Sequence, residues 1–261
     1  MASDSISALF PLDDRVAVVT GGGSGIGRAT ARLFAAAGAR VMVLDRAHDA
    51  AAEVADEIAA TGRHGAAFGA DVAVEADVER VFAEIRAREG RCDILVNNAG
   101  IAIRRPSVEL ALDDWDKVVA VNMTGVFLCA RAAARHMIEA GEGGAVVNTA
   151  SIMGLSGGGL YPNISYQATK GAVVNMTRAL AVEWARHGIR VNAVAPTWVR
   201  TPFIAPLLEN PDLLAEIVRV TPLGRLAEPH EVAAAILFLA SPAAAMITGH
   251  TLPVDGGFLA Q

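Results

Sequence analysis

The chain has 261 residues, of which 53% are hydrophobic and 19% charged, and its formal net charge is -6. A disordered chain combines low hydrophobicity with high net charge, so this composition excludes disorder and predicts a packed protein, with one large domain as the default at this length. The mildly acidic balance and the lack of a basic run argue against a nucleic-acid surface, which would have to neutralise several phosphates.

Three features of the sequence indicate the cellular compartment of the protein, namely its cysteines, its N-terminus and two uncharged stretches. Cys92 and Cys129 have no Cys-x-x-Cys spacing, which favours inert thiols over a disulfide framework. Residues 1–11 show no basic start followed by an apolar segment, so we expect no secretory signal and a cytoplasmic protein. The uncharged stretches 143–169 and 232–254 are interrupted by Gly, Pro and polar residues, which indicates loops and not membrane spans.

Short β-branched runs alternate with longer alanine-rich stretches along the chain. The runs are too continuously apolar to have one solvent-facing side, which predicts strands buried on both faces. The stretches between them are long enough for crossover helices. This alternation predicts a single α/β domain over residues 1–261, with a doubly wound parallel sheet and helices on both faces. The expected strands are 15–20, 40–44, 66–69, 94–96, 145–148 and 190–194, and the expected helices are 27–37, 50–61, 75–88, 113–140 and 165–186.

Residues 197–222 interrupt the alternation. They contain four prolines and few strand-forming residues. Long irregular segments in compact domains often cover ligand sites, so we expect these residues to form a mobile flap over the substrate.

A glycine-rich turn, Thr20-Gly-Gly-Gly-Ser-Gly-Ile-Gly27, follows the first expected strand and precedes a helical stretch. A diphosphate needs backbone N–H groups at a helix N-terminus and no side chain that blocks its approach, and this turn offers both. The spacing differs from the general Gly-x-Gly-x-x-Gly fingerprint, so the turn alone also fits an ordinary tight loop. The residues of this turn expected to bind a dinucleotide are Gly21, Ser24, Gly25, Ile26 and Gly27.

The second expected strand ends near Asp45, which bears on the choice between NAD and NADP. A carboxylate at this point accepts hydrogen bonds from the ribose hydroxyls of NAD and repels the 2'-phosphate of NADP. Arg46 could hold that phosphate through a bidentate contact if Asp45 turned away. Ser24 adds no second positive charge, so we expect NAD, with NADP as the alternative.

Ser151, Tyr166 and Lys170 form the candidate reactive group. Tyr166 and Lys170 are four residues apart in a helical stretch and therefore share one helix face. An ammonium there is expected to lower the pKa of the phenol, so that Tyr166 can exchange a proton with an alcohol or carbonyl oxygen. Ser151 follows the fifth expected strand, at the sheet edge where ligands bind. An isolated Tyr-x-x-x-Lys more often marks a helix surface, but the glycine turn in the same chain favours the reactive interpretation.

This combination resembles the short-chain dehydrogenases/reductases, in the branch without a separate C-terminal substrate domain, over nearly the whole chain. The resemblance implies a Rossmann-type fold and an NAD(P)-dependent enzyme that acts on CH–OH groups. In that family Tyr is the acid/base, Lys also binds the nicotinamide ribose, Ser orients the substrate oxygen, and the backbone of an Asn holds a water of the proton relay. The implied catalytic residues are Asn122, Ser151, Tyr166 and Lys170, and the further implied cofactor contacts are Asp71, Val72, Asn98, Ala99, Gly100, Pro196, Val199 and Thr201.

The sequence departs from the family pattern at two places. Tyr166 lies fifteen positions after Ser151, a longer gap than usual, and the extra residues 157–163 are expected to reshape the substrate pocket. Similar members with a longer loop act on polyols and sugar derivatives. Thr197 follows Pro196 where the family has Gly, which restricts the backbone near the nicotinamide. The residues expected to line the substrate pocket are Ser151, Met153, Asn163, Tyr166 and Trp198.

The expected function is NAD-dependent interconversion of a secondary alcohol, of polyol or sugar-derivative type, and a ketone. An alternative is an NADPH-dependent reductase of 3-oxoacyl thioesters, which needs a basic patch for a phosphopantetheine arm where the chain offers only Arg200, Arg219 and Arg225. A remote alternative is a non-catalytic dinucleotide sensor. The presence of all four reactive residues argues against that sensor.

The expected partners are a small-molecule substrate and further copies of the chain. The helical stretches 113–140 and 165–186 carry apolar residues on more than one face, which predicts a homotetramer. No nucleic acid, membrane or metal partner is expected, the last because the six histidines lack metal-ligand spacing.

Overall fold

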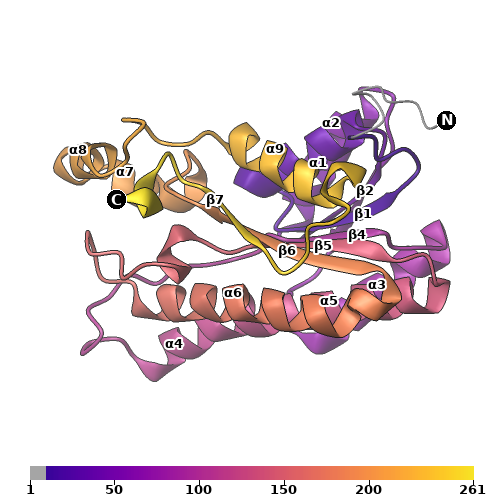
Figure 1. Ribbon diagram of the computed structural model, residues 1–261, viewed down its shortest axis with the longest axis horizontal. Helices are drawn as coiled ribbons and strands as arrows, with labels where there is room; N and C mark the ends of the chain where they lie inside the picture. The colour runs from indigo at the N-terminus through magenta and orange to yellow at the C-terminus, as the bar shows by residue number, and fades with distance from the viewer. Residues whose placement is uncertain (1–9) are drawn as a thin grey trace.

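The centre of the molecule is a parallel sheet of seven strands in the order β3-β2-β1-β4-β5-β6-β7 (Figure 1). The chain runs outward from β1 to β3 and then returns to the other side of β1 to form β4. A crevice opens outside the carboxyl ends of the strands where the direction reverses. The strands are β1 Val16–Thr20, β2 Arg40–Asp45, β3 Gly65–Gly69, β4 Ile94–Asn97, β5 Gly144–Thr149, β6 Ile189–Pro196 and β7 Thr251–Val254.

The computed structural model describes residues 10–261. Most of the N-terminal segment that carries the expectation about a secretory signal lies outside the described residues. All six expected strands are present, with ends that differ by a few residues.

Strand β7, the edge strand beside β6, was not predicted from the sequence. Its sequence, Thr-Leu-Pro-Val, contains Pro253. Proline cannot donate a hydrogen bond to a neighbouring strand, so it weakens a strand prediction from sequence while being tolerated at a sheet edge.

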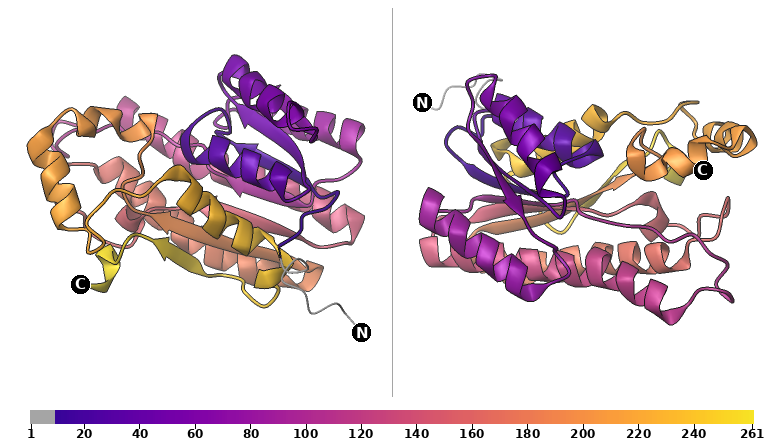
Figure 2. Two further views of the ribbon diagram at one scale, coloured as in Figure 1. Left: turned by 90° about the horizontal axis from the view of Figure 1, so that it is seen from above. Right: turned by 180° about the vertical axis from the view of Figure 1, so that it is seen from behind.

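Helices cover both faces of the sheet (Figures 1 and 2). One face carries α1 Gly25–Ala36, α2 His48–Ala59 and α9 Pro229–Ala240, and the other carries α3 Glu75–Glu89, α4 Leu112–Val119, α5 Gly125–Ala140 and α6 Ile164–Trp184. The continuous Val and Leu runs of the inner strands are buried on both sides, as expected of a parallel sheet between two helical layers.

Helix α9 was also not anticipated, because residues 232–254 were interpreted as loops. Pro229 occupies the first turn, and Glu228 and Glu231 form a reciprocal capping box at its start. A proline in the first turn and a glutamate three residues after the capping residue are sequence signals of a helix start, so this helix was predictable. The other interruption, at Pro242, lies where the helix has already ended.

The expected helix 113–140 is divided by a π-helical segment, Ala120–Thr124, between α4 and α5. By length and composition, the stretch Leu112–Ala140 is the one described helix that could cross a membrane. More than half of its most apolar window is buried inside the structure, as in a helix that belongs to a protein core.

Residues 197–222 are more regular than expected. They contain a 3-10 turn, Pro202–Ile204, and two short helices, α7 Ala205–Leu208 and α8 Pro211–Arg219. Buried apolar side chains of this segment, Trp198 among them, pack with Met153 beside the crevice. Whether the segment moves stays a prediction.

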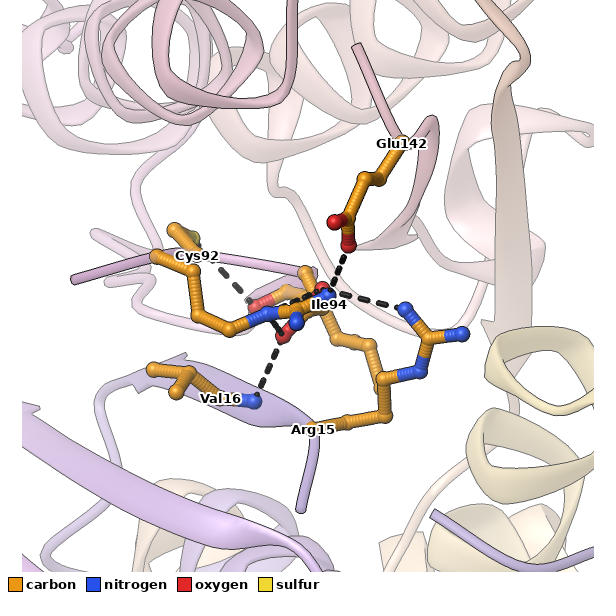
Figure 3. A network of polar contacts seen from close by, with 7 residues as sticks. Arg15, Val16, Cys92, Ile94 and Glu142 are labelled. Atoms are coloured by element: carbon orange, nitrogen blue, oxygen red, sulfur yellow. Dashed lines mark hydrogen bonds and ion pairs between the residues drawn. The ribbon is translucent and has the colours of Figure 1, made fainter. Parts of the chain in front are cut away.

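A charged network joins the strands at the edge opposite the crevice (Figure 3). Asp93, before β4, is almost fully buried and accepts a hydrogen bond of 2.8 Å from the backbone N–H of Val16 in β1. Its carboxylate also pairs with Arg15 and Arg91, and Arg91 reaches Glu142 in the turn before β5. These contacts fix the starts of the central strands relative to each other, which fixes in turn where their carboxyl ends lie.

Candidate active site

The turn after β1 and the residues after β4 meet at the point where the sheet reverses direction. The hydroxyl of Thr20 accepts hydrogen bonds from the backbone N–H groups of Asn98 and Ala99, at 3.0 and 3.1 Å. The Asn98 side chain in turn donates to the carbonyls of Thr20 and Gly21, at 3.2 and 3.1 Å. The two loops are therefore held together at the base of the crevice.

Two glycines of the turn are required by close packing. A Cβ atom at Gly21, whose φ is +61°, would lie 2.9 Å from the Cα of Ala99. A Cβ atom at Gly27 would lie 2.1 Å from the carbonyl oxygen of Gly21. Any larger residue at either position would push the turn away from α1 or from the loop after β4.

One cleft of about 320 Å³ runs along the carboxyl ends of the strands. Among the residues predicted to bind cofactor or substrate, only Gly27 does not line it, because Gly27 is packed beneath the turn. Of the predicted catalytic residues, only Asn122 lies outside its lining. The structure thus brings together Gly21, Ser24, Gly25, Ile26, Asp45, Arg46, Asp71, Val72, Asn98, Ala99, Gly100, Ser151, Met153, Asn163, Tyr166, Lys170, Pro196, Trp198, Val199 and Thr201.

Asp45 lies at the end of β2 and its carboxylate is fixed by backbone donors. One oxygen accepts from the N–H of Gly23 at 3.0 Å, and the other accepts from the N–H of Ala47 at 3.0 Å. These contacts hold the carboxylate against the glycine turn. Arg46 is exposed at the same end of the cleft.

Ser151, Tyr166 and Lys170 lie at the other end of the cleft. Ser151 follows β5, and its hydroxyl accepts a hydrogen bond of 3.1 Å from the N–H of Met153. Tyr166 and Lys170 are on one face of α6, with the Lys170 ammonium 5.5 Å from the centroid of the Tyr166 ring. Lys170 is 3% exposed and donates a hydrogen bond of 2.6 Å to the carbonyl of Thr149.

Burial controls the pKa values of this pair. It raises the pKa of Tyr166 to about 12, although the neighbouring Ser151 hydroxyl and the Arg104 charge act in the opposite direction. Burial also lowers the pKa of Lys170 to about 8. The expectation that the ammonium lowers the pKa of the phenol is therefore wrong for this structure, since the cost of burying a phenolate outweighs the charged and polar groups around it.

Asn122 lies behind the cleft in the π-helical segment and is fully buried. Its side-chain amide donates to the carbonyl of Ile101 at 2.9 Å and to the Thr169 hydroxyl at 3.3 Å, and its carbonyl oxygen accepts from the N–H of Ile101 at 2.9 Å. The side chain thus joins the loop after β4 to α6, the helix that carries Tyr166 and Lys170.

The cleft wall also contains side chains that were not anticipated, among them Arg104, Tyr161 and Phe203. The Arg104 guanidinium lies 5.7 Å from the centroid of the Tyr161 ring and 5.5 Å from that of Phe203. Tyr161 belongs to the inserted residues 157–163, so the unusual gap was the available signal for it. No local pattern marks Arg104 or Phe203, because they meet only in the folded chain.

Trp198 is 4% exposed and forms part of this wall. Its indole N–H donates a hydrogen bond of 2.8 Å to the Tyr161 hydroxyl, and its ring contacts Phe258 edge to face. Thr197 beside it causes no backbone strain, because Asp14 is the one non-glycine residue with positive φ among those described.

The chain matches, over residues 21–259, a protein family described as enoyl-(acyl carrier protein) reductase. It is 42% identical to D-threitol dehydrogenase of Mycolicibacterium smegmatis, over 97% of this chain and 96% of the relative. It is 44% identical to galactitol 2-dehydrogenase of Cereibacter sphaeroides, over 96% and 97% of the two chains. It is 46% identical to cis-4-hydroxycyclohexanecarboxylate dehydrogenase of Sinomonas cyclohexanicum, over 95% and 97%.

Solved structures agree with these relatives. A short-chain type dehydrogenase/reductase from Mycobacterium marinum superposes with a TM-score of 0.95 at 38% identity, covering 98% of this chain and all of the other. A putative NAD(P)-dependent gluconate 5-dehydrogenase from Beutenbergia cavernae, solved with bound NADP, has a TM-score of 0.92 at 44% identity, covering 97% and 99%.

The buried Lys170 predicts a specific dependence of stability on pH. Its folded pKa of about 8 is below the value of an unfolded chain. The folded chain therefore binds fewer protons than the unfolded one as pH rises from about 8, and the free energy of unfolding increases. Relative to Lys170→Met, the parent should gain about 1 to 2 kcal/mol between about pH 8 and pH 9.5. Urea unfolding of both proteins measures this difference, and parallel pH curves would contradict it.

Proposed function

The chain belongs to the short-chain dehydrogenase/reductase family and is an oxidoreductase that acts on CH–OH groups, and we propose that it interconverts a secondary alcohol of polyol or sugar-derivative type and a ketone with NAD. The observation that carries the proposal is the convergence of the glycine turn, Asp45, Ser151, Tyr166 and Lys170 on one cleft. The relatives named for threitol and galactitol support a polyol substrate.

The cleft residues fit a nicotinamide dinucleotide. Between Gly21 and Gly25 the turn carries no side chain larger than the hydroxymethyl group of Ser24, and a Cβ atom at Gly25 would lie 3.0 Å from the Thr201 side chain. When bound, NAD supplies the hydride acceptor. We assign the diphosphate to the turn, the adenosine to Asp45, Asp71, Val72, Asn98 and Ala99, and the nicotinamide side to Gly100, Lys170, Pro196, Val199 and Thr201.

In the proposed mechanism, Ser151 holds the substrate oxygen and Tyr166 exchanges the proton with it. The raised pKa of Tyr166 keeps the phenol protonated at neutral pH, so Tyr166 is a proton donor toward a ketone. Alcohol oxidation requires the phenolate, which burial makes costly, so we assign Lys170, on the same helix face, to carrying the proton away from Tyr166. The backbone of Asn122 holds a water that connects Lys170 to solvent, while the Asn122 side chain keeps its segment in place.

The cofactor preference rests on Asp45. Its two backbone hydrogen bonds fix the carboxylate at the glycine turn, so it does not turn away to make room for a 2'-phosphate. Arg46 remains the one feature that favours NADP, and the Beutenbergia cavernae structure with NADP shows that relatives accept that cofactor.

The reduction of 3-oxoacyl thioesters is less well supported. The three arginines that would form the basic patch are paired with glutamates, Arg200 with Glu228, Arg219 with Glu216 and Arg225 with Glu231. Each pair is neutral overall, so the segment lacks the positive surface that an acidic carrier would require.

We also assign the protein to the cytoplasm. Cys92 and Cys129 are free, buried thiols, and burial raises the pKa of each to about 12, which leaves them unreactive. Such thiols are typical of a reducing compartment.

Replacing Tyr166 with Phe tests the acid/base role. The change removes the exchangeable proton and almost no contact area, so kcat should fall by a factor of about 10² to 10⁴ while the Kd for NADH stays within about twofold. Steady-state kinetics with D-threitol or galactitol and fluorescence titration of NADH measure the two quantities. Tyr161→Phe removes the other tyrosine hydroxyl and should lose far less activity. A Tyr166→Phe enzyme within threefold of the parent would refute the role.

Replacing Asp45 with Ser tests the cofactor preference. In the parent, kcat/KM for NAD should exceed that for NADP by about tenfold or more, because the carboxylate repels a phosphate dianion. Asp45→Ser should shrink or invert this ratio, while Asp49→Ser, an exposed position in α2, should leave it unchanged. A parent that prefers NADP would show that Arg46 decides, and would favour the thioester reductase.

The exposed apolar residues of α5 and α6 support a homotetramer. Val182 is 82% exposed, and Phe127 and Ile138 are each exposed by more than a third. Light scattering should give a mass near four times the 27.0 kDa of one chain. A mass near that of a single chain would contradict the assignment.

A further inference from the structure

Arg104 is a positively charged side chain in the wall of the substrate end of the cleft. Among residues 10–261, no carboxylate lies within ion-pair distance of it, and its Nε is buried without a hydrogen-bond partner. The buried guanidinium of Arg190 differs, because it donates to the carbonyls of Leu239, Ala240 and Ser241. Arg104 is thus a partly buried cation that has no carboxylate partner among the described residues and an unpaired Nε, although its guanidinium also acts on the Tyr161 hydroxyl. Such groups are costly unless a ligand pairs with them.

Aromatic rings hold the Arg104 guanidinium in place. It lies over the rings of Tyr161 and Phe203, at 5.7 and 5.5 Å from their centroids. Tyr161 is itself fixed by the hydrogen bond from Trp198, whose ring packs on Phe258. Stacking on ring faces orients a guanidinium and leaves the N–H donors in its plane available for a planar, bidentate acceptor.

Phe203 also connects Arg104 to the proposed site of proton transfer. Its ring lies 5.8 Å from that of Tyr166, so one aromatic ring separates the guanidinium from the phenol. A substrate whose carbinol oxygen is at Ser151 and Tyr166 therefore places a group a few carbon atoms further on beside Arg104. Asn163, which is 4% exposed in the same part of the cleft, has a side-chain oxygen without a hydrogen-bond donor.

From this geometry we infer that the substrate is a hydroxy acid, a secondary alcohol with a carboxylate a few carbons from the carbinol, and that Arg104 binds this carboxylate. A guanidinium and a carboxylate form paired N–H···O bonds, which a hydroxymethyl group cannot replace. The unpaired oxygen of Asn163 accepts a hydrogen bond from a further hydroxyl of the substrate. The inference rests on the proposed function and adds the charge of the substrate to it.

The first test compares acids with neutral alcohols of the same carbon skeleton. The pairs are D-gluconate with D-glucitol, D-galactonate with galactitol, and D-threonate with D-threitol, each assayed with NAD and NADP. In the parent, kcat/KM for at least one acid should exceed that for its neutral partner by about tenfold or more, as expected for a hydrogen-bonded charge pair.

Variants of Arg104 identify the group responsible. Arg104→Gln should lower kcat/KM for the preferred acid by about tenfold or more and change that for the neutral partner by less than about threefold. Arg104→Lys, which keeps the charge but not the bidentate geometry, should fall between them. The matched control is Arg105→Gln, which changes the exposed neighbouring residue outside the cleft and should match the parent for both substrates.

Calorimetry supplies a readout that does not depend on turnover. The Kd of the same three acids is measured for the parent, Arg104→Gln and Arg105→Gln, each with and without NADH, and circular dichroism checks that the variants are folded. We expect the Kd of at least one acid to rise about tenfold in Arg104→Gln and to stay unchanged in Arg105→Gln.

The outcomes separate the two proposals. One outcome is that the enzyme oxidises neutral alcohols and that Arg104→Gln changes neither the binding nor the turnover of the acids. This result overturns the hydroxy-acid inference and leaves the proposed function intact. A second outcome is that an acid binds, that this binding depends on Arg104, and that no alcohol is oxidised. This result overturns the proposed function and leaves the carboxylate site. Neither binding nor oxidation for any of the three pairs overturns both.

Discussion

The site depends on the hydrogen bonds that join Thr20 to Asn98 and Ala99. Thr20 is the last residue of β1, and Asn98 and Ala99 directly follow β4. These two strands are neighbours, and the sheet is built outward from them in opposite directions. Loops that leave such strands diverge, so a crevice forms between them. The Thr20 hydroxyl and the Asn98 amide close the base of this crevice, and the absence of side chains at Gly21 and Gly27 allows the turn to approach that closely. Every other cleft residue is positioned relative to this junction.

Burial is the main electrostatic influence at the reactive end of the cleft. It disfavours both the phenolate of Tyr166 and the ammonium of Lys170, so it moves their pKa values in opposite directions, up for the phenol and down for the amine. The two values, which lie close together in exposed side chains, therefore move apart, to about 12 for Tyr166 and about 8 for Lys170. At neutral pH the phenol is protonated, so the resting pair is set to donate a proton to a ketone oxygen.

The distribution of charge along the cleft separates two kinds of recognition. At one end lies the carboxylate of Asp45, which two backbone N–H groups fix and to which we assign the preference for NAD. At the other end, Arg104 offers a guanidinium between two aromatic rings. The arginines around α8 and before α9 are neutralised by glutamates, so the charges that act on a ligand are those inside the cleft. In the proposed function, recognition of the charge of the substrate thus depends on a few side chains inside the cleft.

The sequence by itself determined the parts that consecutive residues encode. Continuous apolar runs defined six strands, and the glycine turn and the Tyr-x-x-x-Lys spacing indicated most of the candidate site. The capping box before α9 is also a sequence signal of a helix start.

Strand β7 could not be predicted with the same ease, because Pro253 is acceptable only at a sheet edge, and the edge position is a property of the whole sheet. The tertiary structure alone decided the pKa values of Tyr166 and Lys170, since desolvation depends on all the atoms that surround a group. The tertiary structure alone also brought Arg104, Tyr161 and Phe203 together. These residues are far apart in the chain, and their contacts form only when separate loops meet at the carboxyl ends of the strands, so no local sequence pattern indicates them.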